Sequence, residues 1–281
     1  MKKVLVAIDF SDCSVNALEH AITIANAADA QILMVWVNKP EGTRDIFTEG
    51  PETLTSMVTD RFEELIEKYK DEAKNPMIFK IREGSIYKEI VKESEDPDIE
   101  MLVAGTHGAS GFEEFWIGSN AYRIVSSVAK PVLTIRGGVD IDRDLNRIVL
   151  PVDSTMETRQ KVPFTAYIAG LFNAEVFVLS VYTTKVYSIQ SRVDGYAEQV
   201  IKHLEEGNIK YHLENILTDN VTTGTIEFAK SIDANLISIM TEQEKTTKNL
   251  WLGPYAQQMV NHSPIPVLSI HPHEFLISLA R

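Results

Sequence analysis

The sequence predicts two tandem α/β domains, each built on a five-stranded parallel sheet flanked by helices. The first observation behind this prediction is an internal repeat, because residues 101–135 align without gaps on residues 236–270 at an offset of 135. The second is that short runs of Val, Ile and Leu alternate with segments of helical periodicity in both halves. In the gap-free alignment, the identical pairs include Trp116 with Trp251, Gly118 with Gly253, Pro131 with Pro266, and Leu133 with Leu268.

The repeat extends to the front of each half and sets the domain boundaries. Residues 3–9 match residues 147–153, and residues 31–37 match residues 175–181, both at an offset of 144. Because the offset then falls to 135, the second copy lacks about nine residues between its second strand and the position of the glycine-rich turn. We predict one domain over residues 1–138 and another over 146–281, joined by a Gly- and Asp-rich linker at 137–146.

The elements of the first half follow in order from apolar runs and helix signals. A continuous apolar run at 4–8 is typical of a strand buried on both faces, and Ser11 or Asp12 can cap the helix that follows. The predicted strands cover residues 4–8, 32–37, 77–83, 101–105 and 131–135, and the predicted helices cover residues 12–27, 52–73, 86–94 and 119–129.

Three strand ends mark the expected ligand edge of this sheet. In doubly wound sheets, ligands bind outside the carboxyl ends of the strands, where the strand order reverses. Asp9, Val37 and Gly105 each lie at such an end, so these distant segments should converge.

A glycine-punctuated turn after the fourth strand has the features of an anion site. Gly105 and Gly108 follow that strand, and Gly118 and Ser119 open the last helix. Glycine lets the backbone approach a ligand closely, and the free N–H groups at a helix start favour phosphate oxygens. Residues 101–122 contain no Lys or Arg, so backbone amides or a divalent ion must neutralise a phosphate. Arg123, the nearest cation, is expected to point away along the helix.

With this spacing the chain resembles the ATP-binding pattern of the universal stress protein family, and its two halves resemble a tandem member of it. The resemblance implies Rossmann-like domains of the adenine nucleotide alpha hydrolase type. It also implies that the last strands, at 131–135 and 266–270, pair across a pseudo-two-fold axis, so that one chain forms an internal pseudo-dimer.

The resemblance also assigns roles to residues of the first half. Ala7 and Asp9 correspond to positions near adenine and ribose, and Val37 corresponds to the backbone group that reads the adenine edge. The ribose–phosphate side and the phosphates correspond to six further positions: Ala104, Gly105, Gly108, Gly118, Ser119 and Asn120. The implied ligand is ATP, or ADP or AMP, with or without Mg²⁺.

The chain departs from the family pattern at several positions. Glu113 and Glu114 place negative charge in the spacer before Gly118, and Asn120 replaces the apolar residue common there. In the second half Asp153 and Val181 persist, but the glycine motif does not. Three replacements remove it: Met240 for Gly105, Gln243 for Gly108, and Pro254 for Ser119. We therefore expect one nucleotide site per chain and a structural or regulatory second half.

The net charge, the apolar runs and the cysteine count limit the classes of function that the chain can have. The net charge is -13, divided as -9 over residues 1–140 (15 basic, 24 acidic) and -4 over the remainder (12 basic, 16 acidic). Such a balance argues against binding to nucleic acid or to an anionic membrane. No apolar stretch approaches the roughly 20 residues that span a bilayer, and Cys13 is the only cysteine. The expectation is a cytoplasmic protein.

Plainer interpretations stay open for several residues. Gly105 and Gly108 can be turn glycines, Asp9 can cap the first helix, and His107 is more typical of a turn than of catalysis. Cys13 reads as an inert thiol. The histidines near the C-terminus (His262, His271 and His273) match no common zinc spacing.

Together with the anion site in the first half, the resemblance implies a stress-response protein that binds an adenine nucleotide there, and we expect it not to catalyse a reaction. Two alternatives remain: a slow ATP-hydrolysing enzyme, and a nucleotide-free dimeric scaffold for protein partners. A homodimer of tandem chains is a further possibility, and the sequence does not identify the stress or the partners.

Overall fold

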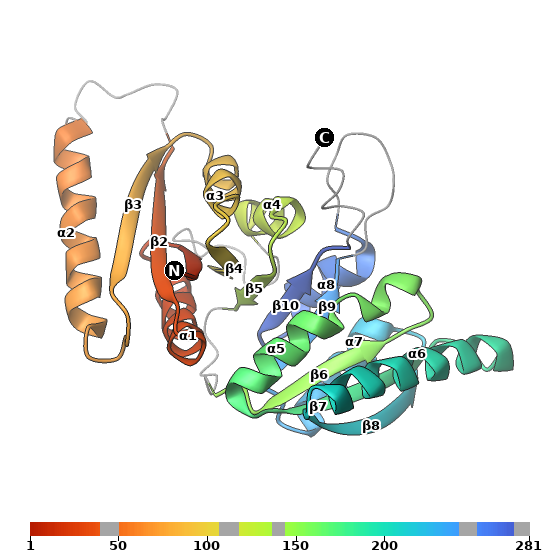
Figure 1. The fold of residues 1–281 in the computed structure, drawn as a ribbon. Coiled ribbons are helices and arrows are strands. Elements are labelled where there is room, and N and C mark those ends of the chain that lie inside the picture. The colour runs from red at the N-terminus through yellow and green to blue at the C-terminus, as the bar shows by residue number, and fades with distance from the viewer. Residues whose placement is uncertain (40–50, 107–117, 137–143, 242–251, 273–281) are drawn as a thin grey trace.

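A computed structural model describes residues 1–39, 51–106, 118–136, 144–241 and 252–272 (Figure 1). The predicted residues Gly108, His107, Glu113, Glu114, Gln243 and His273 lie outside these ranges.

Each half contains five strands and four α-helices among the described residues, and the predicted alternation of strands and helices is confirmed. The first half consists of β1 (Lys3–Ala7), α1 (Asp12–Ala28), β2 (Gln31–Asn38), α2 (Pro51–Tyr69), β3 (Met77–Glu83), α3 (Ile86–Ser94), β4 (Ile99–Gly105), α4 (Ser119–Ser127) and β5 (Val132–Ile135). The second consists of β6 (Arg147–Val152), the 3-10 helix η1 (Met156–Arg159), α5 (Val162–Phe172), β7 (Glu175–Tyr182), α6 (Tyr187–Glu206), β8 (Lys210–Leu217), α7 (Val221–Ser231), β9 (Leu236–Met240), α8 (Pro254–His262) and β10 (Val267–Ile270).

The ten strands form one mixed sheet in the order β3-β2-β1-β4-β5-β10-β9-β6-β7-β8. Pairing is parallel within each half and antiparallel where β5 meets β10. Leu133 pairs with Leu268, its equivalent at an offset of 135, so the pseudo-two-fold axis passes through this pair. The expected pairing of the last strands is confirmed, and it joins the halves into one continuous sheet.

Helices cover both faces of the sheet and bury two apolar cores. One core takes side chains from α1, α2, α5 and α6, and the other takes them from α3, α4, α7 and α8. The strands between them read as continuous apolar runs, because each strand is buried on both faces. The shortened segment of the second half lies before α6, since α6 begins at Tyr187 soon after β7 ends at Tyr182, whereas residues 39–50 separate β2 from α2.

Two helices end earlier than the sequence predicts. The helix predicted to reach residue 73 stops at Tyr69, and beyond it the amide of Lys74 donates to the side chain of Asn26 on α1 (2.7 Å). The helix predicted to reach residue 129 stops at Ser127, because Val128 already has extended backbone ahead of β5. In both places the apolar periodicity continues past the end of the helix. A contact with α1 ends the first helix, and the approach to β5 ends the second.

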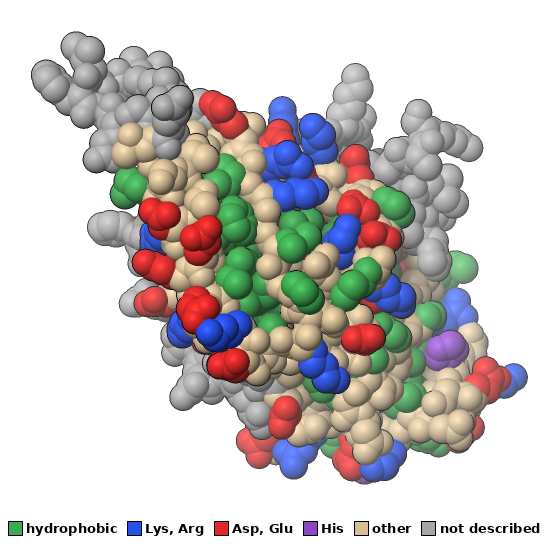
Figure 2. All heavy atoms as spheres, turned by 60° about the vertical axis from the view of Figure 1, so that its left-hand side comes forward, with side chains coloured by type: hydrophobic (Ala, Val, Ile, Leu, Met, Phe, Trp, Pro, Cys, Tyr) green, Lys and Arg blue, Asp and Glu red, His purple; other side chains and the backbone are tan. Residues whose placement is uncertain are grey.

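The surface carries both signs of charge. On the face shown in Figure 2, acidic and basic side chains are interspersed, and acidic ones gather along α2, where Asp60, Glu63, Glu64 and Glu67 lie together. No helix in the described part of the chain is both long and apolar enough to cross a membrane.

Candidate functional site

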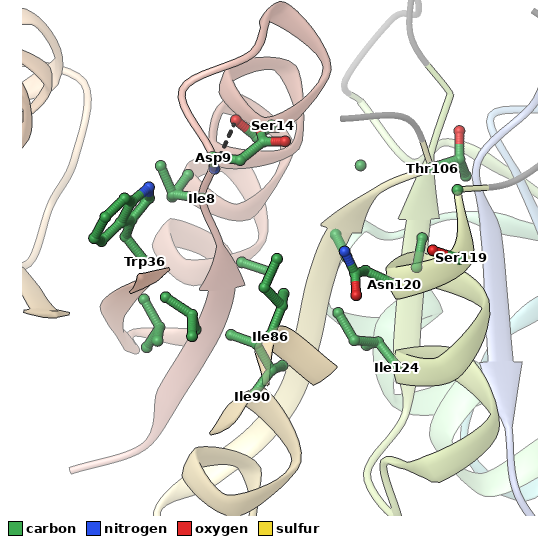
Figure 3. Close-up of a pocket in the computed structure, with 17 residues that line it drawn as sticks. Ile8, Asp9, Ser14, Trp36, Ile86, Ile90, Thr106, Ser119, Asn120 and Ile124 are labelled. Carbon is green, nitrogen blue, oxygen red and sulfur yellow. Dashed lines mark hydrogen bonds between the residues drawn. The ribbon is translucent and has the colours of Figure 1, made fainter. Parts of the chain in front are cut away.

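A cavity of about 210 Å³ opens at the carboxyl ends of β1, β2 and β4. The strand order reverses here, because the chain runs from β1 to β2 and β3 on one side and returns to β4 and β5 on the other. Segments far apart in the sequence border it (Figure 3), and the lining residues are Ala7, Ile8, Asp9, Ser14, Val35, Trp36, Val37, Ile86, Ile90, Ala104, Gly105, Thr106, Gly118, Ser119, Asn120, Ala121 and Ile124.

Eight of the nine residues proposed from the sequence border this one cavity. They are Ala7, Asp9, Val37, Ala104, Gly105, Gly118, Ser119 and Asn120. The ninth, Gly108, lies outside the described residues. The predicted convergence of the three strand ends is therefore observed, while the ligand contacts themselves stay predictions.

One side of the cavity is apolar and was not anticipated from the sequence. Ile86 and Ile90 from α3 lie beside Ile124 from α4, in the lower part of Figure 3. The spacing of Ile86 and Ile90 by four residues places both on one face of a short helix, a signal that was available in the sequence. Such a surface suits a flat, weakly polar ring.

The start of α4 forms another side of the cavity. Gly118 is the N-cap residue of α4, and its own amide donates to the carbonyl of Thr106 (2.8 Å). Gly118 makes no side-chain cap hydrogen bond, and the three residues of the first turn, Ser119, Asn120 and Ala121, line the cavity. The amides of a first helical turn have no partner within the helix. The side chain of Asn120 also points into the cavity (Figure 3). These groups can donate to an anion.

Asp9 organises the turn between β1 and α1. Its Oδ1 accepts from the amide (3.0 Å) and the hydroxyl (2.5 Å) of Ser11, and Ser11 in turn caps α1 by accepting from the amide of Ser14. The hydroxyl of Ser14 accepts from the amide of Asp9 (Figure 3). The helix cap is thus Ser11, and the carboxylate of Asp9 fixes the loop that carries it to the cavity edge.

Gly105 is required by packing as well as by its place in the motif. A Cβ atom there would lie 2.8 Å from Sγ of Cys13 and 3.0 Å from its backbone carbonyl. Cys13 itself is buried, with Sγ 3.4 Å from the carbonyl of Ile135. The glycine therefore allows the first turn of α1 to pack directly on the end of β4.

Asp9 is the only charged side chain that lines the cavity among the described residues. Arg123 is directed elsewhere, since its guanidinium lies 5.2 Å from the ring centre of Tyr87 on α3. Mg²⁺ is usually held by one or two carboxylates together with phosphate oxygens and water. Asp9 fits that pattern, whereas no cluster of three or more metal-ligating side chains occurs in the described ranges.

The second half fills the equivalent positions differently. Met240 and Met259 are buried where Gly105 and Ile124 border the first cavity, and Thr225 is fully buried where Ile90 does so. Asp153 keeps its turn, with Oδ1 accepting from the amide of Thr155 (2.8 Å). Pro254 stands at the first position of α8.

A buried lysine is a further feature of the second half that sequence reasoning missed. Lys161 stands where the first half has Ala17, and its ammonium donates to the carbonyl (2.6 Å) and hydroxyl (3.1 Å) of Thr158. Burial lowers the pKa of Lys161 to about 8, against the opposing effect of Asp153. The hydroxyl of Thr158 also accepts from the amide of Asp153 (3.3 Å), so Thr158 links this ammonium to the turn that holds Asp153.

His271 contacts both halves of the molecule. Its ring nitrogens lie 2.7 Å from the hydroxyl of Thr241 and 2.8 Å from the carbonyl of Val125 on α4. The third C-terminal histidine, His273, is not described, and the carbonyl of His262 lies 3.5 Å from Nη1 of Arg136. These observations give His271 a hydrogen-bonding role between the halves.

Comparisons with known proteins agree with this architecture. The model of the universal stress protein family matches residues 1–136 and again residues 145–271. Two universal stress proteins of Methanocaldococcus jannaschii are 30% identical over 139 residues and 31% identical over 153 residues. Each alignment covers 48% of this chain, and the two cover 82% and 94% of those proteins, so each corresponds to one half.

Solved structures match over the full length. A universal stress protein from Archaeoglobus fulgidus superimposes with a TM-score of 0.73 at 17% identity, covering 96% of this chain and 98% of that one. A putative universal stress protein from Pseudomonas aeruginosa gives 0.70 at 15% identity, covering 99% and 96%. At these identities the likeness is one of fold.

Proposed function

The chain belongs to the universal stress protein family, and we propose that its first half binds ATP or a related adenine nucleotide, ADP or AMP, in the cavity at the switch point. The observation that carries the proposal is that eight residues assigned from the family resemblance border that one cavity. The protein acts as a regulator without catalysing a reaction, and the bound nucleotide biases its packing or its choice of partner.

The two sides of the cavity divide the ligand between them. The apolar side formed by Ile86, Ile90 and Ile124 receives the adenine ring, and the backbone of Val37 reads its edge. The first turn of α4 receives phosphate oxygens through its amides and the hydroxyl of Ser119. Since the described lining has no cationic side chain, Mg²⁺ held by the phosphates and Asp9 would supply the remaining positive charge.

Isothermal titration with ATP and Mg²⁺ tests the proposal. The wild-type protein should release or absorb heat at one site per chain, and the double variant Gly118→Ala, Ser119→Ala should lose at least about tenfold in affinity. Gly170→Ala is the matched control, because a Cβ there meets its nearest neighbour at an ordinary 3.7 Å. An absence of heat from the wild-type protein, or heat that the double variant leaves unchanged, contradicts the proposal.

A slow ATP-hydrolysing activity is the first alternative. In the described part of the cavity Asp9 is the one carboxylate, and its Oδ1 already accepts two hydrogen bonds from Ser11. Phosphate release that disappears with Asp9→Asn while ATP still binds would favour the enzyme over the regulator.

A nucleotide-free scaffold is the second alternative. Mass spectrometry of the gently purified protein separates it from the proposal, because a co-purifying adenine nucleotide would favour a binding protein. A cytoplasmic location, homodimers of the tandem chain and the boundaries at residues 138 and 146 belong to the same proposal, and fractionation and sedimentation can test the first two.

A further inference from the structure

One residue of the second half is hydrogen-bonded to the helix that forms the anion side of the first-half cavity. His271 follows β10 and is only 4% exposed. Its Nε2 lies 2.8 Å from the carbonyl oxygen of Val125 on α4, and its Nδ1 lies 2.7 Å from the hydroxyl oxygen of Thr241, next to the end of β9.

The partners fix the tautomer of this histidine. A carbonyl oxygen only accepts, so Nε2 carries the proton and donates it to Val125. Nδ1 is then the acceptor, and the hydroxyl of Thr241 donates to it. The hydroxyl also lies 3.3 Å from the carbonyl of Ile270, a longer distance than that to the ring. The neutral ring is thereby held at both nitrogens.

The carbonyl that His271 reaches is one that α4 cannot satisfy. Val125 lies in the last turn of a helix that ends at Ser127, and the final carbonyls of a helix have no partner within it. The amide of Val128 already turns back to the carbonyl of Ile124. His271 therefore caps the carboxyl end of α4 from the other half, while the amino end of the same short helix borders the cavity.

The reciprocal position carries a different residue. Arg136 is the equivalent of His271 at an offset of 135, and its Nη1 reaches the carbonyl of His262 at the end of α8 with a distance of 3.5 Å. Arg136 is half-buried rather than buried, and the helix that it meets begins with Pro254 and lacks the glycine motif. Only the contact made by the second half reaches a helix with a proposed ligand at its other end.

We propose that His271 is a positioning residue for the nucleotide site, through which the second half holds α4 in the orientation that presents its first-turn amides to phosphate. The nucleotide part of this inference rests on the proposed function. It gives the second half, which lacks the glycine motif, a defined role. The proposed site lies in the first half, and one contact that orients it comes from the second. Such coupling needs a continuous packed or hydrogen-bonded path, and here the path is one nine-residue helix.

Amide hydrogen exchange of the nucleotide-free protein tests the structural part. In His271→Phe the ring volume is retained and both hydrogen bonds are lost, so the amides of α4 should exchange faster while those of α8 stay unchanged. Arg136→Met is the matched control and should show the opposite pattern. Unchanged protection of α4 in His271→Phe overturns the inference, whether or not the protein binds nucleotide.

Titration with ATP and Mg²⁺ tests the functional part on the same proteins. At a temperature where all variants are folded, His271→Phe should raise the dissociation constant by about two- to thirtyfold. Arg136→Met should leave it unchanged, and His271→Gln, which keeps an N–H donor, should recover part of the loss. Faster exchange of α4 without weaker binding would reduce His271 to a structural residue and overturn the inference.

The two proposals fail in different ways. If the wild-type protein binds no adenine nucleotide, the proposed function fails and the coupling to nucleotide fails with it. In that case faster amide exchange of α4 in His271→Phe still supports the claim that the second half stabilises α4. Unchanged exchange contradicts that claim too. If His271→Phe does not fold, His271→Leu, which likewise removes the donor to the carbonyl of Val125, replaces it in both measurements.

Discussion

The two half-sheets end in different structures at their carboxyl edges. In the first half, Gly105 lets α1 begin at Asp12, directly against the end of β4. In the second, Met240 occupies that position, residue 156 begins the short 3-10 helix η1, and α5 begins only at Val162. A side chain that replaces the glycine cannot share the space that the first turn of α1 uses. The difference teaches that the residue at the end of the fourth strand of each half decides where the first α-helix of that half can pack, and under the proposed function only the first half keeps this edge open for a ligand.

The largest expected effect comes from Gly105→Met, which gives the first half the residue of the second. The added side chain meets Cys13 within 2.8 Å, so we expect the first turn of α1 to move and ATP binding to be lost. Overpacking should also lower the free energy of unfolding by about 3 kcal/mol. Denaturant unfolding and calorimetric titration measure the two effects.

Gly195→Met is the control for this substitution, because no atom lies within 4 Å of a Cβ built at Gly195. It should leave the affinity close to the wild-type value and should not lower the unfolding free energy, since methionine has a higher helix propensity than glycine within α6. Tight ATP binding by Gly105→Met would show that the packing of α1 on β4 does not matter to the site.

The second effect is the pH dependence of the unfolding free energy, compared between His271 and Arg136, the two residues that contact a helix of the opposite half. Burial lowers the pKa of His271 to about 4, although the hydrogen bond to Val125 acts to raise it. The folded protein therefore resists protonation that the unfolded chain accepts near its ordinary pKa of 6.5. The stability that the neutral ring contributes is complete above pH 6.5 and falls as the pH drops toward 4, by up to about 3 kcal/mol.

Comparison of wild type with His271→Gln isolates this dependence from that of the carboxylates. The difference in unfolding free energy between the two proteins should shrink as the pH falls from 6.5 to 4. Arg136→Met should instead keep the wild-type slope. Parallel curves for wild type and His271→Gln over this range would contradict the buried neutral state.

The third effect comes from Ser119→Pro, which again imports a second-half residue. Proline removes the amide of Ser119 but is tolerated at the first helical position. Gly118 (φ -57°, ψ 144°) already has nearly the backbone conformation of Gly253 (φ -57°, ψ 155°), which precedes Pro254. We expect the unfolding free energy to stay nearly constant and ATP affinity to fall about tenfold.

Ser119→Ala separates the amide from the hydroxyl in this experiment, since it keeps the former and removes the latter. The loss of ATP affinity in Ser119→Ala should be smaller than in Ser119→Pro. Equal affinity of wild type and Ser119→Pro would remove the backbone amide of residue 119 from phosphate binding.

The smallest effect lies at the junction of β5 and β10. The hydroxyl of Thr134 lies 3.3 Å from the carbonyl of Val267, whereas the buried hydroxyl of Ser269, its equivalent, has no hydrogen-bond partner among the residues that the structure describes. Thr134→Val should therefore lower the unfolding free energy by about 1 kcal/mol, while Ser269→Ala should be neutral or slightly stabilising. Equal losses from the two substitutions, measured by denaturant unfolding, would contradict the asymmetry.

The sequence was sufficient for the fold and for much of the site. Apolar runs and the repeat specified every strand of the first half, and the rule for strand ends brought Asp9, Val37 and Gly105 together. Periodicity placed the ends of α2 and α4 less well, because Lys74 bonds to a distant side chain and Val128 leads into β5.

Contacts between distant elements account for what the sequence did not reveal. The reason for a glycine at position 105 lies in Cys13, which is adjacent only in the folded chain. The role of His271 depends on Val125, a partner across the pseudo-axis that no local pattern identifies. Lys161 bonds to Thr158 only three residues away, and what the sequence did not reveal is that this lysine is buried.

The count of nucleotides bound per chain tests the difference between the halves most directly. Native mass spectrometry in the presence of ATP and Mg²⁺ should show one nucleotide per chain. The bound nucleotide should be absent from Gly105→Met and retained by Met240→Gly, which alters only the second half. Two bound nucleotides per wild-type chain, or one that survives Gly105→Met, would contradict the assignment of a single site to the first half.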